Sequence, residues 1–545
     1  MARSLLSTFL LVALLALLLD AAVAAAAAAR RLATDPKPSP SSVIIVGAGM
    51  AGVMAAKTLS EAGVKDFVIL EATEVIGGRM READFAGKRI ELGANWVEGV
   101  NKTTTNPIWK LANQYKLRTF YSNFDNLSHN IYTQNGHLQN KLGENLMSKS
   151  DDSSDFVDEL GLSKSESNAP DMSVLSAQKL HGVFPKTPVE MVLDYYNYDY
   201  EFAEPPSVTS LKNTQPNPTF HNFGDDNYLV ADQRGYSYLV QKLAEEFLAN
   251  KNGKITDPRL QLNKVVRQIK YSKTGVTATT EDGKVYNSKY IIVTVSLGVL
   301  QSDLIKFNPG LPDWKREALS EFDMAVYTKI FLKFPYKFWP SNGPLTEFFL
   351  YADERRGYYP IWQHLENEYP GANVMFVTVT DYESRRIEQQ PNNETIAEIH
   401  EVLKSMFGPS VPKPTDILVP RWWSNRFFVG SFSNWPIGVE AFEFERIQAP
   451  LSHTLYFAGE HTHEHYNGYV HGAYYSGIDA ANKLLDCMKK NKCVDKVPKA
   501  PAHRTGEKRR RNMESAEASV VKERDLSRRE WDKQLHGILA VNSAH

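Results

Sequence analysis

The sequence predicts an α/β protein, and three observations lead to this prediction. A β-branched run at 43–46 enters the glycine turn G-A-G-M-A-G and then a helix, as at the start of a parallel nucleotide-binding sheet. Strand patterns such as 327–334 then alternate with helical periodicity such as 394–407 along most of the chain. Near the C-terminus, a glycine-rich turn follows the apolar run 454–457 and opens another helix. This alternation is typical of an α/β protein with an added sheet.

The first glycine turn has the spacing of a dinucleotide site. Gly47 allows a tight turn, Gly49 lets a pyrophosphate approach the backbone, and Gly52 lets the next helix pack closely. The N–H groups at the start of that helix stabilise the anion. A second strand at 67–70 ends at Glu71, which can accept both hydroxyls of a ribose. We interpret the segment as a dinucleotide site rather than a structural turn, and these residues alone leave NAD and FAD open.

Length and charge limit the remaining possibilities. The 545 residues carry a net charge of -2, with 42% hydrophobic side chains. A chain of this length exceeds one ordinary core, so we expect two interleaved domains. The near-zero charge gives no general attraction to nucleic acid or to a membrane surface, and neither is expected as a partner.

Residues 1–30 are predicted to be a secretory signal peptide. An apolar run at 5–19 follows a single arginine and precedes a zone of small residues at 21–29. The run is long enough to be an uncleaved anchor, which is the alternative. Asp20 and the many A-x-A sites favour cleavage, and no second stretch of the sequence could span a membrane.

Cysteines and asparagines agree with export. The chain has two cysteines, Cys487 and Cys493, and an even number in an exported chain suggests a disulfide. Glycosylation sequons occur at Asn101, Asn126 and Asn393. Two asparagines are not counted because proline follows them: Asn106 and Asn217.

Two polar segments are expected to lie outside the core. Residues 148–167 are rich in Ser, Asp and Glu, and we expect a solvated loop or short surface helices there. The composition becomes highly charged after Cys493, so 494–545 is expected to be a largely disordered tail. We interpret its basic cluster as part of a solvated tail rather than as a nuclear signal.

Motifs along the folded part of the chain resemble those of the FAD-dependent amine oxidases. Besides the glycine turn and Glu71, they are G-G-R-M at 77–80, E-L-G-A-N-W-V-E-G at 91–99 and F-A-G-E-H at 457–461. Further segments are most similar to the plant secreted polyamine oxidases of that family: Y-E-F-A-E-P-P at 200–206, G-D-D at 224–226, M-A-V-Y-T-K at 324–329 and H-Y-N-G-Y-V-H-G-A-Y at 465–474.

The resemblance implies a Rossmann-like FAD-binding domain interleaved with an α+β substrate-binding domain. The expected FAD-binding segments are 41–119, 213–312 and 423–493, and the expected substrate-binding segments are 120–212 and 313–422. FAD is expected to be noncovalent, because relatives that attach it use a cysteine where Tyr469 stands here. The residues implied to contact FAD are Gly47, Gly49, Gly52, Glu71, Arg79, Asn95, Trp96, Val97, Glu98, Val266, Phe428, Glu460, Tyr469 and Val470. At Phe428 the plant enzymes usually have a tyrosine, so we expect one hydrogen bond to be missing.

A strand at 327–334 carries the expected chemistry. Tyr327, Lys329 and Phe331 share one face because side chains alternate along a strand, which places an ammonium group among aromatic rings. Periodicity alone leaves a surface lysine as the alternative. The resemblance implies that Lys329 hydrogen-bonds through water to the flavin N5, where its charge stabilises reduced flavin and developing superoxide. The expected catalytic residues are Lys329, Glu98 and Tyr327.

Acidic and aromatic residues are expected to bind a polycation, because carboxylates fix ammonium groups while aromatic rings hold methylenes. By resemblance, Glu98 lies near the flavin and Glu201 lies further along a tunnel with Phe202. Asp225 and Asp226 lie nearer its entrance. The aromatic residues implied to bind substrate are Tyr327, Phe432 and Tyr469.

Two other features of the sequence have more than one interpretation. Trp422 either shapes the pocket or only packs in the core. Three histidines invite a metal site: His461, His463 and His465. We expect no metal, because no carboxylate or cysteine pattern completes such a site.

The expected function is FAD-dependent oxidation of spermidine and spermine at a carbon next to the secondary amine. O2 and water would give an aminoaldehyde, 1,3-diaminopropane and H2O2. A back-converting polyamine oxidase or another flavin amine oxidase is the alternative, and a catalytically silent flavin-binding protein is a rival of another class. The resemblance further implies a secreted, apoplastic monomer, with the vacuole as the alternative destination.

Overall fold

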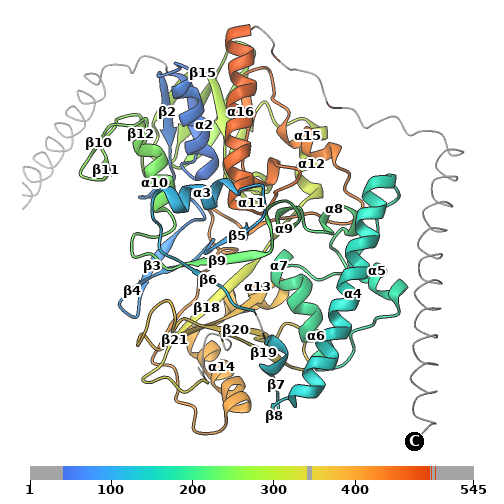
Figure 1. The fold of residues 1–545 in the computed structure, drawn as a ribbon. Coiled ribbons are helices and arrows are strands. Elements are labelled where there is room, and N and C mark those ends of the chain that lie inside the picture. Colours follow the sequence, from blue (N-terminus) through green and yellow to red (C-terminus); the bar gives the residue numbers. More distant parts are fainter. Residues whose placement is uncertain (1–40, 125, 341–346, 491–492, 494–497, 499–545) are drawn as a thin grey trace, which may run out of the picture. The chain divides into compact units, whose positions relative to one another are not determined.

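The computed structural model describes residues 41–124, 126–340, 347–490, 493 and 498 (Figure 1). The predicted signal peptide, and the tail 494–545 apart from position 498, lie outside the described residues. From Ser42 onward the described chain forms one compact unit by its internal contacts. The boundaries of the two expected domains therefore stay a prediction.

The largest sheet contains the predicted nucleotide-binding strand. Its order is β12-β2-β1-β15-β14-β13-β16, and β24 pairs in parallel with β15. Its strands are β1 (Ser41–Val46), β2 (Phe67–Leu70), β12 (Leu260–Gln261), β13 (Val266–Ser272), β14 (Gly275–Thr280), β15 (Val285–Val293), β16 (Lys306–Asn308) and β24 (Leu455–Phe457). Parallel pairing of β1 with β2 brings the glycine turn and Glu71 to the same edge, as expected.

Two helices begin at the edge of this sheet where the cofactor residues gather. They are α2 (Met50–Glu61) and α16 (Val470–Lys490), which lie side by side (Figure 1). A Cβ on Gly477 would come within 2.2 Å of the Ala51 carbonyl oxygen, so the two backbones meet directly. Both predicted glycine turns therefore lead into one helix pair.

A second sheet carries Tyr327 and Lys329. Its order is β22-β18-β21-β20-β19-β7-β8. Its strands are β7 (Ile131–Thr133), β8 (Gly136–His137), β18 (Tyr327–Lys333), β19 (Phe348–Ala352), β20 (Ile361–His364), β21 (Val374–Thr380) and β22 (Asp416–Leu418). Both faces of β18 are buried, since Ile330 packs in one hydrophobic cluster and Phe331 in another.

The other sheets among the described residues are small. The three-stranded sheet has the order β5-β9-β6, and its strand β5 carries Trp96, Val97 and Glu98. The smaller strands are β5 (Trp96–Val100), β6 (Thr119–Tyr121), β9 (Asp226–Val230), β3 (Glu82–Phe85), β4 (Lys88–Glu91), β10 (Asn250–Lys251), β11 (Lys254–Ile255), β17 (Asp323–Ala325) and β23 (Phe432–Asn434).

The expectation of a loop or short helices at 148–167 is wrong. The segment belongs to α4 (Asn140–Ser167), one continuous helix of 28 residues. Val157 is fully buried, and a Cβ on Gly143 or Gly161 would come within about 2.3 Å of a neighbouring carbonyl. Tertiary packing at these small residues stabilises one long helix, where the composition alone suggested a loop or short surface helices.

The remaining helices surround the two sheets. The longer ones are α3 (Pro107–Gln114), α5 (Val174–His181), α6 (Pro188–Asp194), α10 (Tyr238–Glu245), α12 (Asp313–Glu321), α13 (Asp381–Gln389), α14 (Asn392–Phe407) and α15 (Phe442–Gln448). The short ones are η1 (Leu127–His129), the π-helix η2 (Tyr195–Asp199), α7 (Tyr200–Phe202), α8 (Leu211–Thr214), α9 (Pro218–Phe223), α11 (Leu297–Gln301) and η3 (Glu460–Thr462). No helix in the described part of the chain combines the length and apolarity needed to cross a bilayer.

Candidate active site

A cavity of about 310 Å³ extends from the glycine turn of β1 to strand β18. Most residues singled out from the sequence line it: Gly47, Gly49, Glu71, Arg79, Asn95, Trp96, Val97, Glu98, Glu201, Phe202, Val266, Tyr327, Lys329, Trp422, Phe428, Phe432, Glu460, Tyr469 and Val470. Among the residues implied to contact FAD or to lie along the substrate tunnel, three do not line it: Gly52, Asp225 and Asp226. Residues up to 423 positions apart in sequence therefore share one space.

Close contacts at two glycines of the first turn, Gly47 and Gly52, exclude a larger residue there. Gly47 has a φ of +105°, and a Cβ there would lie 2.6 Å from Thr294 Oγ1. Gly52 lies behind the turn, where a Cβ would come 2.0 Å from the Gly47 carbonyl oxygen. Gly49 faces the cavity as the residue before α2. The turn thus leaves room for a pyrophosphate beside N–H groups that have no partner within the helix.

Glu71 is held by the backbone at the end of β2. Its side chain is buried, and its two oxygens accept hydrogen bonds from the backbone N–H of Ala48 at 2.8 Å and of Thr73 at 2.9 Å. Burial raises the pKa of Glu71, and these hydrogen bonds oppose the rise. The fixed carboxyl group borders the cavity where a ribose would meet it. Both the turn and this acid therefore fit an adenine dinucleotide.

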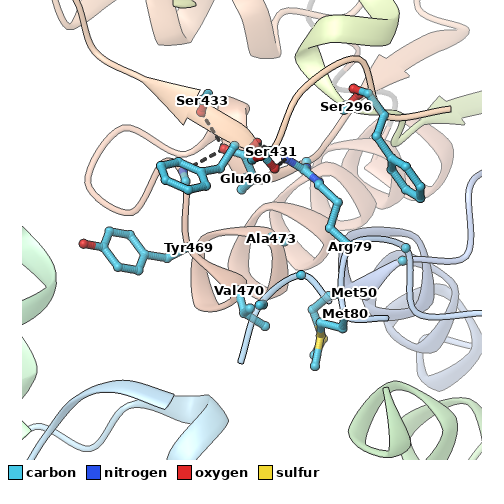
Figure 2. Close-up of a pocket in the computed structure, with 18 of the residues that line it drawn as sticks. Met50, Arg79, Met80, Ser296, Ser431, Ser433, Glu460, Tyr469, Val470 and Ala473 are labelled. Carbon is cyan, nitrogen blue, oxygen red and sulfur yellow. Dashed lines mark hydrogen bonds and ion pairs between the residues drawn. The ribbon is translucent and has the colours of Figure 1, made fainter. Parts of the chain in front are cut away.

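Arg79 and Glu460 form an ion pair within the cavity wall (Figure 2). Arg79 Nη1 donates to Glu460 Oε1 at 2.8 Å and to the Ser431 carbonyl at 2.9 Å. The Ser433 hydroxyl, at 2.5 Å, and the Gly468 N–H, at 2.7 Å, donate to Glu460 Oε2. Burial opposes the charge, but the Arg79 guanidinium and these hydrogen bonds hold the pKa of Glu460 below its usual value. This ionised carboxylate fixes the turn that precedes α16.

Lys329 points into the cavity from β18. Its Nζ donates to Asn95 Oδ1 at 2.5 Å and to the Gly93 carbonyl. The same atom lies 5.3 Å from the centre of the Trp96 ring and 5.8 Å from that of Tyr327. The ammonium group therefore lies among aromatic rings, as strand periodicity predicted, and Lys329 is not a surface lysine.

The protonation state of Lys329 is sensitive to pH because its side chain is buried. Burial lowers the pKa of Lys329 to about 7, while nearby Glu91 and Glu98 act in the opposite direction. Burial also raises the pKa of Glu91 to about 8. Lys329 can therefore gain or lose a proton near neutral pH, which an exposed lysine does not do.

Two carboxyl groups inside the cavity, Glu98 and Glu201, are close enough to interact electrostatically. Burial raises the pKa of Glu98 well above its usual value, and Glu201 adds to this rise while Lys329 opposes it. Burial also raises the pKa of Glu201, but hydrogen bonds from Tyr469 and Asn217 oppose that rise. The Tyr469 hydroxyl donates to Glu201 Oε1, and Asn217 Nδ2 donates to the same oxygen at 3.2 Å. The cavity is thus suited to cations.

Aromatic rings line the path between these groups. The Tyr200 ring centre lies 6.3 Å from that of Trp96 and 5.9 Å from that of Tyr327, which in turn lies 5.9 Å from Phe432. The side chain of Tyr469 points away from the Arg79–Glu460 pair (Figure 2). Rings of this kind hold methylene groups and stabilise cations.

Trp422 both lines the cavity and packs against its neighbours. Its ring meets Phe428 edge-on with centres 5.0 Å apart, and its Nε1 donates to the Leu92 carbonyl at 3.2 Å. Phe428 lines the cavity with no hydroxyl to offer, as its sequence implies. Trp422 therefore shapes the cavity as well as packing, and the interpretation that it only packs in the core does not hold.

The similarity to known proteins gives the family. Residues 50–485 match the model of the flavin containing amine oxidoreductases. The chain belongs to this family. It is 58% identical to polyamine oxidase 1 of Zea mays over 83% of this chain and 91% of that protein. It is 57% identical to polyamine oxidase 6 of Oryza sativa subsp. japonica over 83% of this chain and 92% of that protein.

Solved structures show the same fold for this amine oxidoreductase. Wild-type putrescine oxidase bound to putrescine aligns with a TM-score of 0.64 at 16% identity, covering 82% of this chain and 99% of that chain. The recognised family, the fold class and the enzyme class are confirmed. The protein is an FAD-dependent oxidoreductase, and the glycine turn and Glu71 fit the adenylate half of that cofactor.

Two asparagines are among the cavity residues of this amine oxidoreductase that sequence reasoning missed. Asn106 and Asn217 are the N-caps of α3 and α9, and both line the cavity. Asn106 Nδ2 donates to the Glu98 carbonyl at 2.7 Å and lies 3.5 Å from His471 Nδ1. The signal was present, since asparagine before proline marks a helix start with proline at its first position.

Other predicted residues lie outside the cavity. Asp226 lines a second, separate hollow together with Asn101 and Trp109, while Asp225 is exposed. The three sequon asparagines are exposed: Asn101, Asn126 and Asn393. A disulfide joins Cys487 to Cys493 at the end of α16.

The three histidines stay without a metal-binding arrangement. Across the described residues, no group of three His, Cys, Asp or Glu side chains is placed to hold a metal ion. His461 is buried next to Glu460, and the His463 ring stacks on Tyr466 with centres 4.9 Å apart.

Proposed function

We propose that this enzyme oxidises the polyamines spermidine and spermine, with O2 as the electron acceptor. The observation that carries the proposal is the pair of enclosed carboxyl groups, Glu98 and Glu201, in a cavity walled by aromatic rings. A polyamine offers several ammonium groups to carboxylates, and methylene segments to the rings. The printed names of the plant relatives support the same substrate class.

The residues of the chain bind and orient such a substrate. Bound FAD supplies the two-electron acceptor for the C–H bond next to the nitrogen and returns the electrons to O2. Glu98 and Glu201 bind the amine groups and fix which carbon lies at the reacting position. Phe432 and Tyr469 form the walls around that position, and the Tyr469 hydroxyl also orients Glu201 by donating a hydrogen bond to it. Lys329 holds a positive charge beside the developing negative charge.

We assign the cut to the side of the secondary amine that releases 1,3-diaminopropane. The other products are an aminoaldehyde and H2O2. A back-converting enzyme would instead return putrescine from spermidine. Chromatography of the products from spermidine distinguishes the two outcomes, and putrescine as the main diamine would overturn the assignment.

We also propose that the enzyme is exported and acts as a soluble monomer after signal cleavage. The disulfide at the end of α16 and the exposed sequon asparagines support this route. Expression of the full chain in plant cells would show where the protein accumulates, and N-terminal sequencing would locate the cleavage. Retention of the uncleaved chain in membranes would contradict the proposal.

The substrate class has a direct test. The purified yellow enzyme is mixed with spermidine, tyramine and leucine, and H2O2 is measured for each. We expect the highest kcat/KM with spermidine. Anaerobic spermidine should also bleach the flavin absorbance, which a catalytically silent flavoprotein would not show. Faster H2O2 formation with tyramine or leucine would overturn the polyamine assignment.

A further inference from the structure

Asn217 connects the start of a helix to two cavity side chains. Its Oδ1 accepts the Thr219 backbone N–H at 2.9 Å and thereby caps α9. Its Nδ2 donates to Glu201 Oε1 at 3.2 Å and to the Tyr469 hydroxyl oxygen at 2.7 Å. Both ends of the amide are therefore hydrogen-bonded: the oxygen to the backbone of α9, and the nitrogen to two side chains of the cavity.

The segment that carries Asn217 is held on two sides. A Cβ on Gly161 of α4 would come 2.3 Å from the Gln215 carbonyl oxygen, so the helix rests directly on this segment. After the cap, the Thr219 hydroxyl lies 3.1 Å from His471 Nε2 on α16. Because α4 and α16 both fix this segment, the direction of the Asn217 amide is set by the fold.

The two cavity carboxyl groups differ in what supports a negative charge. Glu201 Oε1 accepts two hydrogen bonds, whereas no group among the described residues donates to the Glu98 carboxyl group. Two like charges in one enclosed site resist simultaneous ionisation, and hydrogen-bond donors favour the charged form of the group they contact. The charge therefore belongs on Glu201 when only one of the pair is ionised.

Other groups around the pair do not reverse this preference. Those facing Glu201 are Tyr196, Tyr200, Tyr469, Asn217 and Glu98. Those facing Glu98 are Tyr200, Tyr236, Tyr469, Glu201 and Lys329. Lys329 is the cation that favours charge on Glu98, but its Nζ donates to Gly93 and Asn95 instead.

We propose that Asn217 is a positioning residue that keeps Glu201 ionised and leaves the proton of the pair on Glu98. This inference rests on the proposed function, in which the cavity receives a polyamine. Ionised Glu201 then binds a remote ammonium group of the substrate. Neutral Glu98 does not hold a proton on the reacting nitrogen, which must be uncharged for oxidation. The Asn217 amide thus gives the two carboxyl groups different roles: Glu201 is the charged anchor, and Glu98 is the neutral group beside the reacting nitrogen.

The test replaces Asn217 without removing its cap. Asn217→Ser keeps a good N-cap but loses the amide donor. Below neutral pH we expect KM for spermidine to rise about tenfold, because hydrogen bonds to charged groups have about that effect. FAD content should stay unchanged, and the KM difference should fade at alkaline pH, where Glu201 ionises without help. Ser173→Ala removes the cap of α5 away from the cavity, so it should lower Tm without this pH-dependent change.

A double-mutant cycle shows whether Asn217 acts through Glu201. In a Glu201→Gln background, Asn217→Ser should have little further effect on KM at any pH. An equal effect in both backgrounds would overturn the inference, as would a pH profile of KM that is the same in Asn217→Ser and in the wild type.

Calorimetry with 1,8-diaminooctane tests the pair without turnover. Titrations of the anaerobic holoenzyme in two buffers of different ionisation enthalpy give the protons released on binding. We expect about one proton for the wild type near pH 6, released from the amine that lies beside neutral Glu98, and more for Asn217→Ser, whose partly protonated Glu201 also releases a proton. Equal release would overturn the inference. Diamine binding without spermidine oxidation would overturn only the proposed function, and absence of diamine binding would overturn both.

Discussion

The two ends of the cavity are built by different means. The nucleotide end consists of backbone from one short stretch, 43–52, together with Glu71. The substrate end consists of side chains from separate elements, among them Glu98 on β5, Glu201 on α7 and Lys329 on β18. At the first end the backbone itself is closely packed, so Gly47 and Gly52 tolerate no added side chain. Side-chain charges depend on neighbouring groups, so single substitutions can alter the chemistry of the substrate end one residue at a time.

The largest effect is expected at the nucleotide end. In Gly52→Ala the added methyl group would lie 2.0 Å from the Gly47 carbonyl oxygen, which forces α2 away from the turn. Overpacking of this kind costs about 3 kcal/mol, so purified protein should lose nearly all of its flavin absorbance. Gly310→Ala is the control, because no heavy atom lies within 4 Å of its added Cβ. Full FAD occupancy in Gly52→Ala would contradict the backbone account of this end.

A change at the substrate end should leave FAD bound and alter the chemistry. Lys329→Met should lower the rate constant for reaction of reduced enzyme with O2 about 10²-fold, the usual scale for losing one electrostatic stabiliser. Stopped-flow absorbance of the flavin measures this step. Lys333→Met changes the next lysine on the same face of β18, outside the cavity lining, and should react at the wild-type rate. Equal O2 reactivity in the two variants would remove Lys329 from the mechanism.

The two half-reactions should respond oppositely to pH. Glu201 must be ionised to bind an ammonium group and the reacting nitrogen must be neutral, so substrate oxidation should speed up as pH rises. Lys329, with a pKa of about 7, loses its charge as pH rises through that value. The O2 reaction should therefore slow above about pH 7. Stopped-flow measurement of each half-reaction as a function of pH tests this expectation. If both rates changed with pH in the same direction, Lys329 would not be the group that titrates.

The smallest effect on activity is expected away from both ends. The disulfide between Cys487 and Cys493 closes a short loop at the end of α16, while the cavity borders the beginning of that helix. Replacing both cysteines with serine should lower the free energy of unfolding by about 2 kcal/mol. KM for spermidine and the O2 rate should stay unchanged. Loss of FAD from this double variant would show that the two ends depend on the whole length of α16.

Features of the site that are local in sequence could be predicted. The glycine turn and Glu71 are separated by few residues, and their geometry follows from strand, turn and helix. The placement of Tyr327 and Lys329 on one face of β18 follows from the period of a strand. The resemblance to a family supplied most of the remaining cavity residues, including Glu98 and Glu201.

Features that depend on tertiary contacts could not be predicted. Asn217 meets Tyr469 across 252 positions, and its importance depends on the direction of one amide. Sequence reasoning treated its following proline only as a bar to glycosylation. Helix α4 was missed because its polar composition hides the glycines that pack on neighbouring carbonyls. In both cases a small side chain matters because of what approaches it from elsewhere in the chain.

The direct contact between α2 and α16 has a consequence for cofactor choice. Helix α2 begins at the pyrophosphate turn, and α16 begins directly after Tyr469. Because Gly477 meets the Ala51 carbonyl without intervening side chains, the distance between these two helix starts is fixed. A flavin must have a set length to reach both, so FMN, which lacks the adenylate half, cannot replace FAD. The fixed separation of the two helix starts therefore favours a flavin cofactor that is long enough to reach both.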